Sequence, residues 1–162
     1  MKTYLEPKEV DRIEQAAECL RDKHLVRLLA RLGCRVSEAL GIAVSDIDFD
    51  QTRGGPVGKN GHRLLFGLTR EYAWLLVKTC ASRAGLDQLV NRETGQVNGI
   101  SPHRLRDAFA THAIKLDGSS DGLRLLQEHL GHQSIATTMK YRKVSGDEHR
   151  DWYQRLWNTS SA

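Results

Sequence analysis

The chain has 162 residues, of which 40% are hydrophobic and 27% are charged, and its formal net charge is +4. This is an ordinary balance for a soluble protein, and the length suffices for one domain built around one core. No apolar run approaches the roughly 20 residues that a membrane span requires, and the start of the chain lacks the apolar stretch of a secretory signal. We therefore expect a cytoplasmic protein with no membrane partner.

The three cysteines, Cys19, Cys34 and Cys80, are an odd number and include no C-x-x-C pair. This pattern favours neither a disulfide framework nor a thiolate zinc site. The positive charge permits an anionic partner but does not identify one.

Two amphipathic helices are expected at the start of the chain. Pro7 suits the first turn of a helix, and an apolar stripe predicts that this helix covers about 7–21. A second stripe predicts a helix that Gly33 ends in the left-handed conformation, and its members are Leu25, Leu28, Leu29 and Leu32.

The middle of the chain is less regular. Ser37 is expected to cap a short helix over 38–40, and residues 46–50 alternate as a brief strand would. Residues 51–61 hold four glycines and one proline, which predicts a loop. A further helix is then expected from its cap at Thr69 to about Ala84.

The second half is expected to be helical after a polar linker over 91–96. Ser101 followed by Pro102 is typical of a helix start, and the apolar stripe that follows is Leu105, Phe109, Ala113 and Leu116. Another helix is expected over 120–131, a short one capped by Ser134, and an aromatic one around 152–157. The pattern predicts a mainly α, single-domain protein over 1–162.

The candidate functional residues are polar groups placed at the ends of these helices. Arg35 follows a helix stop, and His103 and Arg106 share one face of a first helical turn. His132 follows another helix end, and Tyr141 comes soon after it. Two arginines, the histidines and one phenol suit an anion whose charge is spread over several oxygens.

These residue types fit phosphoryl transfer. A guanidinium pairs two phosphate oxygens at once and stays charged, so Arg35 and Arg106 would clamp a phosphodiester. His103 and His132 can donate hydrogen bonds or move a proton. A pocket rich in arginine would favour the phenolate of Tyr141, which makes this residue the candidate nucleophile.

Two other interpretations use the same residues. Taken singly, each of them is more often a surface, structural or packing residue than a catalytic one, and His112 is interpreted as structural. A metal site is also conceivable, since His129 and His132 lie on adjacent turns and His103 offers a third imidazole. Nearby arginines would repel the cation, and no acidic or cysteine ligand completes the set.

Four sequence motifs in order resemble those of the tyrosine recombinase (phage integrase) family. The first-arginine motif is Gly33-Cys34-Arg35-Val36-Ser37-Glu38-Ala39-Leu40, and the second is Ser101-Pro102-His103-Arg104-Leu105-Arg106-Asp107-Ala108-Phe109-Ala110-Thr111-His112. Residues 126–141 resemble the stretch from Leu-Gly-His to the nucleophile, and residues 4–10 the start of the catalytic domain.

The resemblance implies an enzyme that cuts and rejoins DNA strands at specific sites. Tyr141 would attack a phosphodiester of double-stranded DNA to give a 3′-phosphotyrosyl link, with no cofactor and no metal. Arg35 and Arg106 would hold the phosphate, His103 would donate a hydrogen bond or accept a proton, and His132 would donate to a phosphate oxygen. Such enzymes work as homo-oligomers, namely tetramers, on paired sites, and the aromatic helix over 152–157 would dock on a neighbouring subunit or on its own domain.

The chain departs from the family pattern in two places. It starts directly at the catalytic part, so the N-terminal core-binding domain is expected to be absent. The three-stranded sheet that supplies a general-acid lysine is expected to be missing or reduced, and Lys59 resembles that lysine only superficially. The alternative function is therefore a DNA-binding or regulatory relative, or a trimmed form, with impaired catalysis. A type IB topoisomerase uses similar chemistry, but Leu130-Gly131-His132 favours the recombinases.

Overall fold

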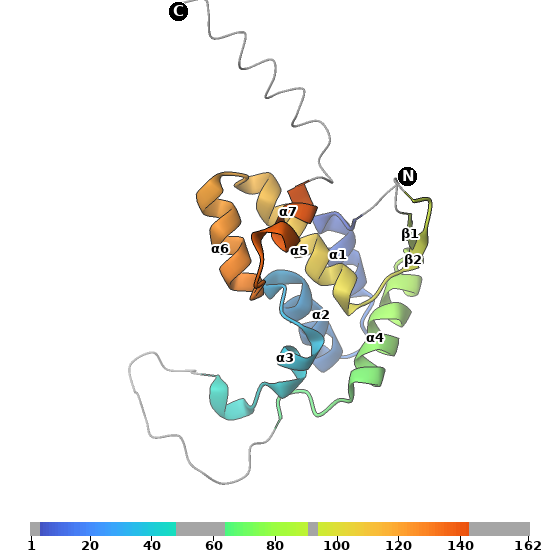
Figure 1. Ribbon diagram of the computed structural model, residues 1–162. Coiled ribbons are helices and arrows are strands. Elements are labelled where there is room, and N and C mark those ends of the chain that lie inside the picture. The colour runs from blue at the N-terminus through green and yellow to red at the C-terminus, as the bar shows by residue number, and fades with distance from the viewer. Residues whose placement is uncertain (1–3, 48–63, 91–93, 143–162) are drawn as a thin grey trace, which may run out of the picture. The chain divides into compact units, whose positions relative to one another are not determined.

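The computed structural model (Figure 1) describes residues 4–47, 64–90 and 94–142. The chain divides into two compact units. Unit 1 comprises residues 1–109 and unit 2 residues 110–162, so the boundary falls inside one helix. The expected loop over 51–61, Lys59 and the expected aromatic helix over 152–157 lie outside the described residues. In the part of the chain that is described, no helix combines the length and apolarity needed to cross a bilayer.

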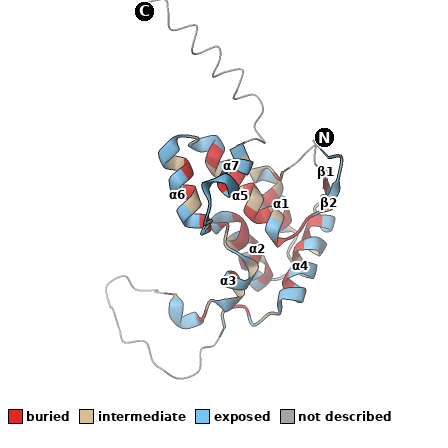
Figure 2. Cartoon of the chain, in the orientation of Figure 1, coloured by how far each residue is buried: buried red, intermediate tan, exposed pale blue. Residues whose placement is uncertain are grey.

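Unit 1 is built from helices that pack around one apolar core. α1 (Pro7–Gln15) packs against α2 (Leu20–Leu32) and α4 (Arg70–Arg83), and α3 (Val36–Gly41) contacts α2 and α4. The first part of α5 (Pro102–Leu116) completes the core. Figure 2 shows buried and exposed segments alternating along α4. The largest fully buried side chains of this core are Leu5, Ile13, Leu25, Val26, Leu29, Val77, Cys80 and Leu105.

The helix ends follow the local chemistry of the sequence. α2 ends at Gly33, which has φ 60°, and the Thr69 hydroxyl caps α4 by accepting from the Tyr72 N–H at 3.2 Å. Both ends were expected from the sequence, and both are confirmed. The cap expected at Ser37 is wrong, because α3 already begins at Val36 and Arg35 is its N-cap residue.

Three other expectations within unit 1 are corrected. The helix expected over 7–21 ends at Gln15, and a separate helix begins at Leu20, whose side chain is 71% exposed. The strand expected over 46–50 does not begin at Asp46, which ends a 3₁₀ turn, η1 (Val44–Asp46), and residues 48–50 lie outside the described residues. The polar linker over 91–96 lies between two short strands that the sequence did not predict, and β1 (Gln88–Val90) pairs antiparallel with β2 (Val97–Gly99).

The sheet expected to be missing or reduced corresponds to one antiparallel bridge in the described residues around the gap. Ala43 pairs with Leu64, and the Leu65 N–H donates to the Ile42 carbonyl at 2.8 Å. The chain therefore enters and leaves residues 48–63 at neighbouring points. The mainly α fold class is confirmed by the seven α-helices and one two-stranded sheet of the described residues.

Unit 2 contains the end of α5 together with α6 (Ser120–Leu130) and α7 (Ile135–Arg142), and α6 packs against α7. Ser119 caps α6 by accepting from the Gly122 N–H at 3.0 Å, and Gly131 ends it with φ 60°. Ser134 accepts from the Ala136 N–H at 3.2 Å, as expected for the start of α7. The buried side of the unit includes Ile114, Leu123, Leu126, Leu130 and Thr138.

The stripe expected on α5 is displaced at its end. Leu116 is 75% exposed, and His112, which was interpreted as structural, is also exposed. Toward the end of α5, the buried side chains are instead those of Thr111 and Ile114. The buried face of α5 is therefore rotated from the one that the Leu105, Phe109, Ala113 and Leu116 spacing indicated.

Candidate active site

In unit 1, the turn after α2 lies next to the second arginine motif. Nη1 of Arg106 donates to the Gly33 carbonyl at 2.6 Å, although 73 positions separate the two residues. Arg106 is 5% exposed, so it lies below the surface beside the turn that carries Arg35. Residues of the first and second motifs are thus in direct contact.

Arg35 itself is exposed and is held by Glu38, a partner that the sequence analysis missed. The Arg35 N–H donates to Glu38 Oε2 at 2.7 Å, and Nη1 donates to Oε1 at 2.8 Å. The bond from the Arg35 backbone is the largest cause that lowers the pKa of Glu38, and the charges of Arg35 and Arg106 lower it further. Both arginines therefore lower the pKa of the same carboxylate, that of Glu38. The signal was an acidic residue three positions after Arg35 at the start of a helix.

His103 lies in the first turn of α5, three residues before Arg106. Its side chain is 67% exposed, and its Nε2 lies 3.8 Å from Asp107 Oδ1. Arg104 Nη1 lies 3.0 Å from the other oxygen of Asp107, so this carboxylate is shared by two basic residues. Asp107 is a second neighbour of the site that the motif analysis did not single out.

In unit 2, the structure brings His132 and Tyr141 together. Their rings are stacked, with centroids 6.2 Å apart and an interplanar angle of 13°. His132 Nδ1 lies 3.0 Å from the hydroxyl oxygen of Thr138, which is fully buried on α7. His129, at the end of α6, is exposed. The spacing of the third motif therefore places the expected donor beside the expected nucleophile.

In unit 1, Arg35 and Arg106 both lie close enough to Glu38 to lower its pKa, and His103 lies one turn before Arg106 on α5. In unit 2, His132 stacks on Tyr141. That all five surround one phosphate stays a prediction. Within the described residues, no three His, Cys, Asp or Glu side chains form a group that would hold a metal ion.

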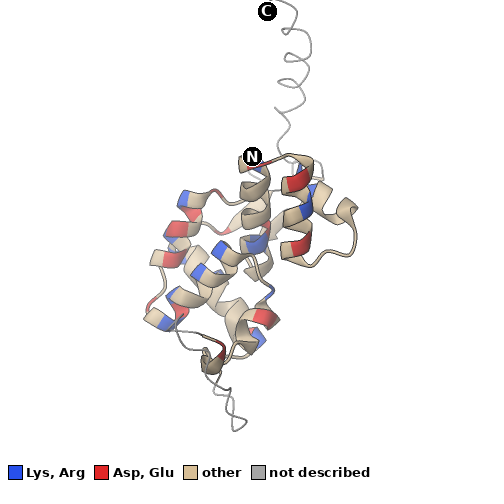
Figure 3. Ribbon diagram, turned by 90° about the vertical axis from the view of Figure 1, so that its left-hand side faces the viewer, with Lys and Arg blue, Asp and Glu red and all other residues tan. Residues whose placement is uncertain are grey.

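Basic and acidic residues are interspersed along the helices, and Figure 3 shows this mixture in the coloured part of the chain. We therefore expect any anion binding at this site to depend on particular arginines.

The sequence profile described as the phage integrase family matches residues 3–88 and 67–148. The chain belongs to the phage integrase family. One integrase-family relative, the tyrosine recombinase XerD of Corynebacterium glutamicum (strain ATCC 13032), is 33% identical over 168 residues, covering 82% of this chain and 51% of that protein. The chain thus spans about half the length of this relative.

Two solved structures of tyrosine recombinases share the fold. The crystal structure of XerA recombinase matches with a TM-score of 0.69 and 24% identity, over 97% of this chain and 66% of that one. The catalytic domain of bacteriophage HP1 integrase matches with a TM-score of 0.59 and 22% identity, over 99% of this chain and 97% of that one. This integrase-family chain therefore has the fold of a catalytic domain of its family.

Proposed function

We propose that this chain, over residues 1–162, is the catalytic part of a site-specific DNA recombinase that cuts and rejoins strands through a 3′-phosphotyrosyl intermediate. The observation that carries the proposal is the contact of Arg106 with Gly33, which joins the two arginine motifs of a phage integrase family member. A phosphate clamp needs two guanidinium groups side by side, and this contact supports such a pair.

Each site residue has one role in the proposed reaction. Arg35 and Arg106 bind the non-bridging oxygens of the scissile phosphate in double-stranded DNA, and His132 donates to the same group. His103 accepts or donates a proton at the reacting oxygens. The donors among these four side chains stabilise the charge that develops on the phosphoryl oxygens during the displacement.

The covalent step balances without an external energy source. The Tyr141 oxygen loses its proton and forms a bond to phosphorus, while the bond from phosphorus to the 5′-oxygen breaks and that oxygen takes up a proton. Attack by a 5′-hydroxyl of a partner duplex reverses these changes and releases Tyr141. One phosphoester replaces another at each step, so the chemistry calls on neither ATP nor a resident metal ion. Exchange between duplexes requires several copies of the chain, and we propose a tetramer on paired sites.

A trapped covalent adduct tests the function. The full chain is incubated with a pool of nicked duplexes of randomised sequence, in which cleavage beside the nick lets the 5′-hydroxyl fragment dissociate. We expect a protein–DNA adduct that resists denaturant and does not form with Tyr141→Phe. Salt-sensitive binding without any adduct would contradict the proposal and favour a binding protein that keeps the site without turnover.

A further inference from the structure

Thr138 is a buried polar residue that contacts the candidate site but has no part in the reaction described above. Its side chain is fully buried on α7, and its hydroxyl oxygen lies 3.0 Å from Nδ1 of His132. A threonine is not among the most frequently buried residue types, and a buried hydroxyl must be hydrogen-bonded to offset its loss of water. Its contact with a site histidine therefore requires an explanation.

The backbone of His132 is fixed from the opposite side by α6. Gly131 ends α6 in the left-handed conformation, and the His132 N–H then donates to the Gln127 carbonyl at 3.0 Å. The side-chain Nε2 of Gln127 donates in return to the His132 carbonyl at 3.0 Å. With both backbone groups held, the remaining freedom of His132 is the rotation of its ring.

Thr138 and the stack with Tyr141 restrict that rotation. Thr138 and Tyr141 are three positions apart on α7 and therefore share one helical face. The Thr138 hydroxyl contacts Nδ1 at the edge of the His132 ring, and the Tyr141 ring stacks on the plane of the His132 ring. The ring is thus oriented by two residues of the helix that carries the expected nucleophile.

The direction of this hydrogen bond decides where the neutral imidazole carries its proton. In neutral imidazole one nitrogen donates and the other accepts. When the threonine hydroxyl donates to Nδ1, the proton must be on Nε2, and Nε2 is then the atom that donates to a phosphate oxygen. The opposite tautomer would present a lone pair to the phosphate and repel it.

We propose that Thr138 is a positioning residue that donates to Nδ1 of His132 and thereby keeps Nε2 protonated and aimed at the scissile phosphate. This inference rests on the proposed function for its catalytic consequence. The tautomer itself is a property of the protein without DNA.

Three single variants test the catalytic consequence. Thr138→Val keeps the shape of the side chain and removes the hydroxyl, Thr138→Ser keeps the hydroxyl, and Thr137→Val makes the same change at the exposed neighbouring position. Adduct formation is measured under single-turnover conditions on the nicked-duplex pool. We expect Thr138→Val to be slower by about tenfold, the size of one net hydrogen bond, with the other two within about twofold of wild type. A Thr138→Val rate equal to that of Thr137→Val would overturn the proposal.

A spectroscopic measurement keeps the inference testable independently of activity and of how well Thr138→Val folds. Nitrogen NMR of the wild-type chain at pH 8, assigned with His132→Gln, reports which ring nitrogen of His132 carries the proton. We expect protonated Nε2 in wild type and Thr138→Ser, and a proton on Nδ1 of wild type would overturn the proposal. If wild type forms no adduct, the proposed function fails, whereas this measurement still decides the role of Thr138.

Discussion

The buried guanidinium of Arg106 donates to the backbone carbonyl of Gly33 across 73 positions of sequence. The same glycine has φ 60°, and the Phe109 ring lies where a Cβ atom at this position would be built. The turn that precedes Arg35 is therefore fixed from two sides by α5, once through a hydrogen bond and once through a close packing contact. The absence of a side chain at Gly33 is what permits the close approach of the Phe109 ring.

Gly33→Ala is expected to destabilise the chain through this packing. A left-handed alanine costs about 1–2 kcal/mol, and the overlap with the Phe109 ring adds about 1–3 kcal/mol. Gly67→Ala is the matched control, because Gly67 has φ 58° and no atom within 4 Å of the added Cβ. Chemical denaturation should show a larger decrease in the free energy of unfolding for Gly33→Ala than for Gly67→Ala. Equal decreases would contradict the packing argument.

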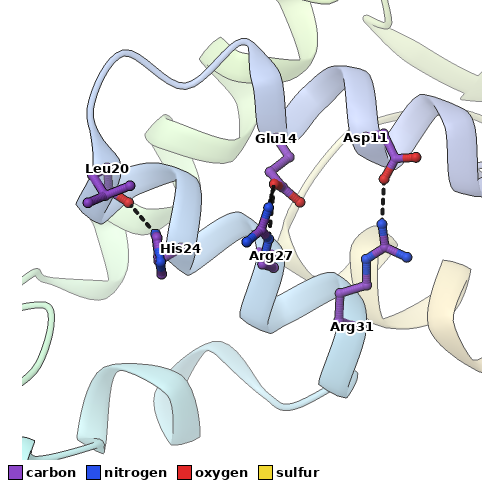
Figure 4. A network of polar contacts seen from close by, with 6 residues as sticks. All are labelled: Asp11, Glu14, Leu20, His24, Arg27 and Arg31. Carbon is purple, nitrogen blue, oxygen red and sulfur yellow. Dashed lines mark hydrogen bonds and ion pairs between the residues drawn. The ribbon is translucent and has the colours of Figure 1, made fainter.

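Two ion pairs between α1 and α2 differ in burial, and Figure 4 shows them side by side. Arg27 donates to Glu14 Oε1 through Nε at 3.0 Å and Nη2 at 2.6 Å, and Glu14 is 5% exposed. Arg31 Nη2 lies 2.5 Å from Asp11 Oδ1, and both of these side chains are substantially exposed.

Arg27→Met is expected to lower the free energy of unfolding more than Arg31→Met. The first variant leaves a buried carboxylate without its guanidinium, whereas an exposed ion pair contributes less than about 1 kcal/mol. Urea denaturation of both variants measures the difference. The double variant Glu14→Leu with Arg27→Met should recover most of the loss, since it removes the unpaired charge; no recovery would show that the loss came from something other than that charge.

The lowered pKa of Glu38 predicts that the contribution of this residue to folding stability is lost in acid. The hydrogen bond from the Arg35 backbone lowers the pKa of Glu38 below its ordinary value of 4.5. A lowered pKa means that the folded state favours the carboxylate, so the contribution is complete above about pH 5 and is lost as the pH falls through the folded-state pKa.

The stability difference between wild type and Glu38→Gln should accordingly be constant near neutral pH and shrink below about pH 4. Thermal unfolding at several pH values measures it, with Glu128→Gln as a control on the exposed side of α6. A difference that grows on acidification would reverse the sign assigned to the Arg35–Glu38 contact.

Helix ends could be predicted because their chemistry is local. Gly33, Thr69 and Gly131 each act within one turn of their own position, and the structure confirms all three. The break between α1 and α2 could not be predicted in this way, since residues 16–19 contain neither glycine nor proline. The hairpin of β1 and β2 was missed because only Leu89 of its six residues is buried, which leaves no alternation to detect.

The candidate site likewise has features that could be predicted from the sequence and features that could not. Its residues could be identified from four motifs, but the partners that hold them depend on the fold. Arg106 reaches Gly33 only because α5 packs beside the end of α2, and Thr138 reaches His132 only because α7 turns back on α6. The spacing of residue types along the chain does not encode such contacts.

Arg35→Gln is expected to change the salt dependence of DNA binding. If Arg35 contacts one phosphate, its loss removes one counterion-releasing contact and reduces the slope of log K against log salt by about 0.9. The backbone bond from residue 35 to Glu38 survives this substitution, so the start of α3 is retained. Binding is measured by titration of a random-sequence duplex at several salt concentrations. Arg83→Gln is the matched control, because Arg83 is exposed at the end of α4 and pairs with Glu18 at 2.6 Å. An equal reduction in both variants would mean that Arg35 acts through net charge alone and not as a phosphate ligand.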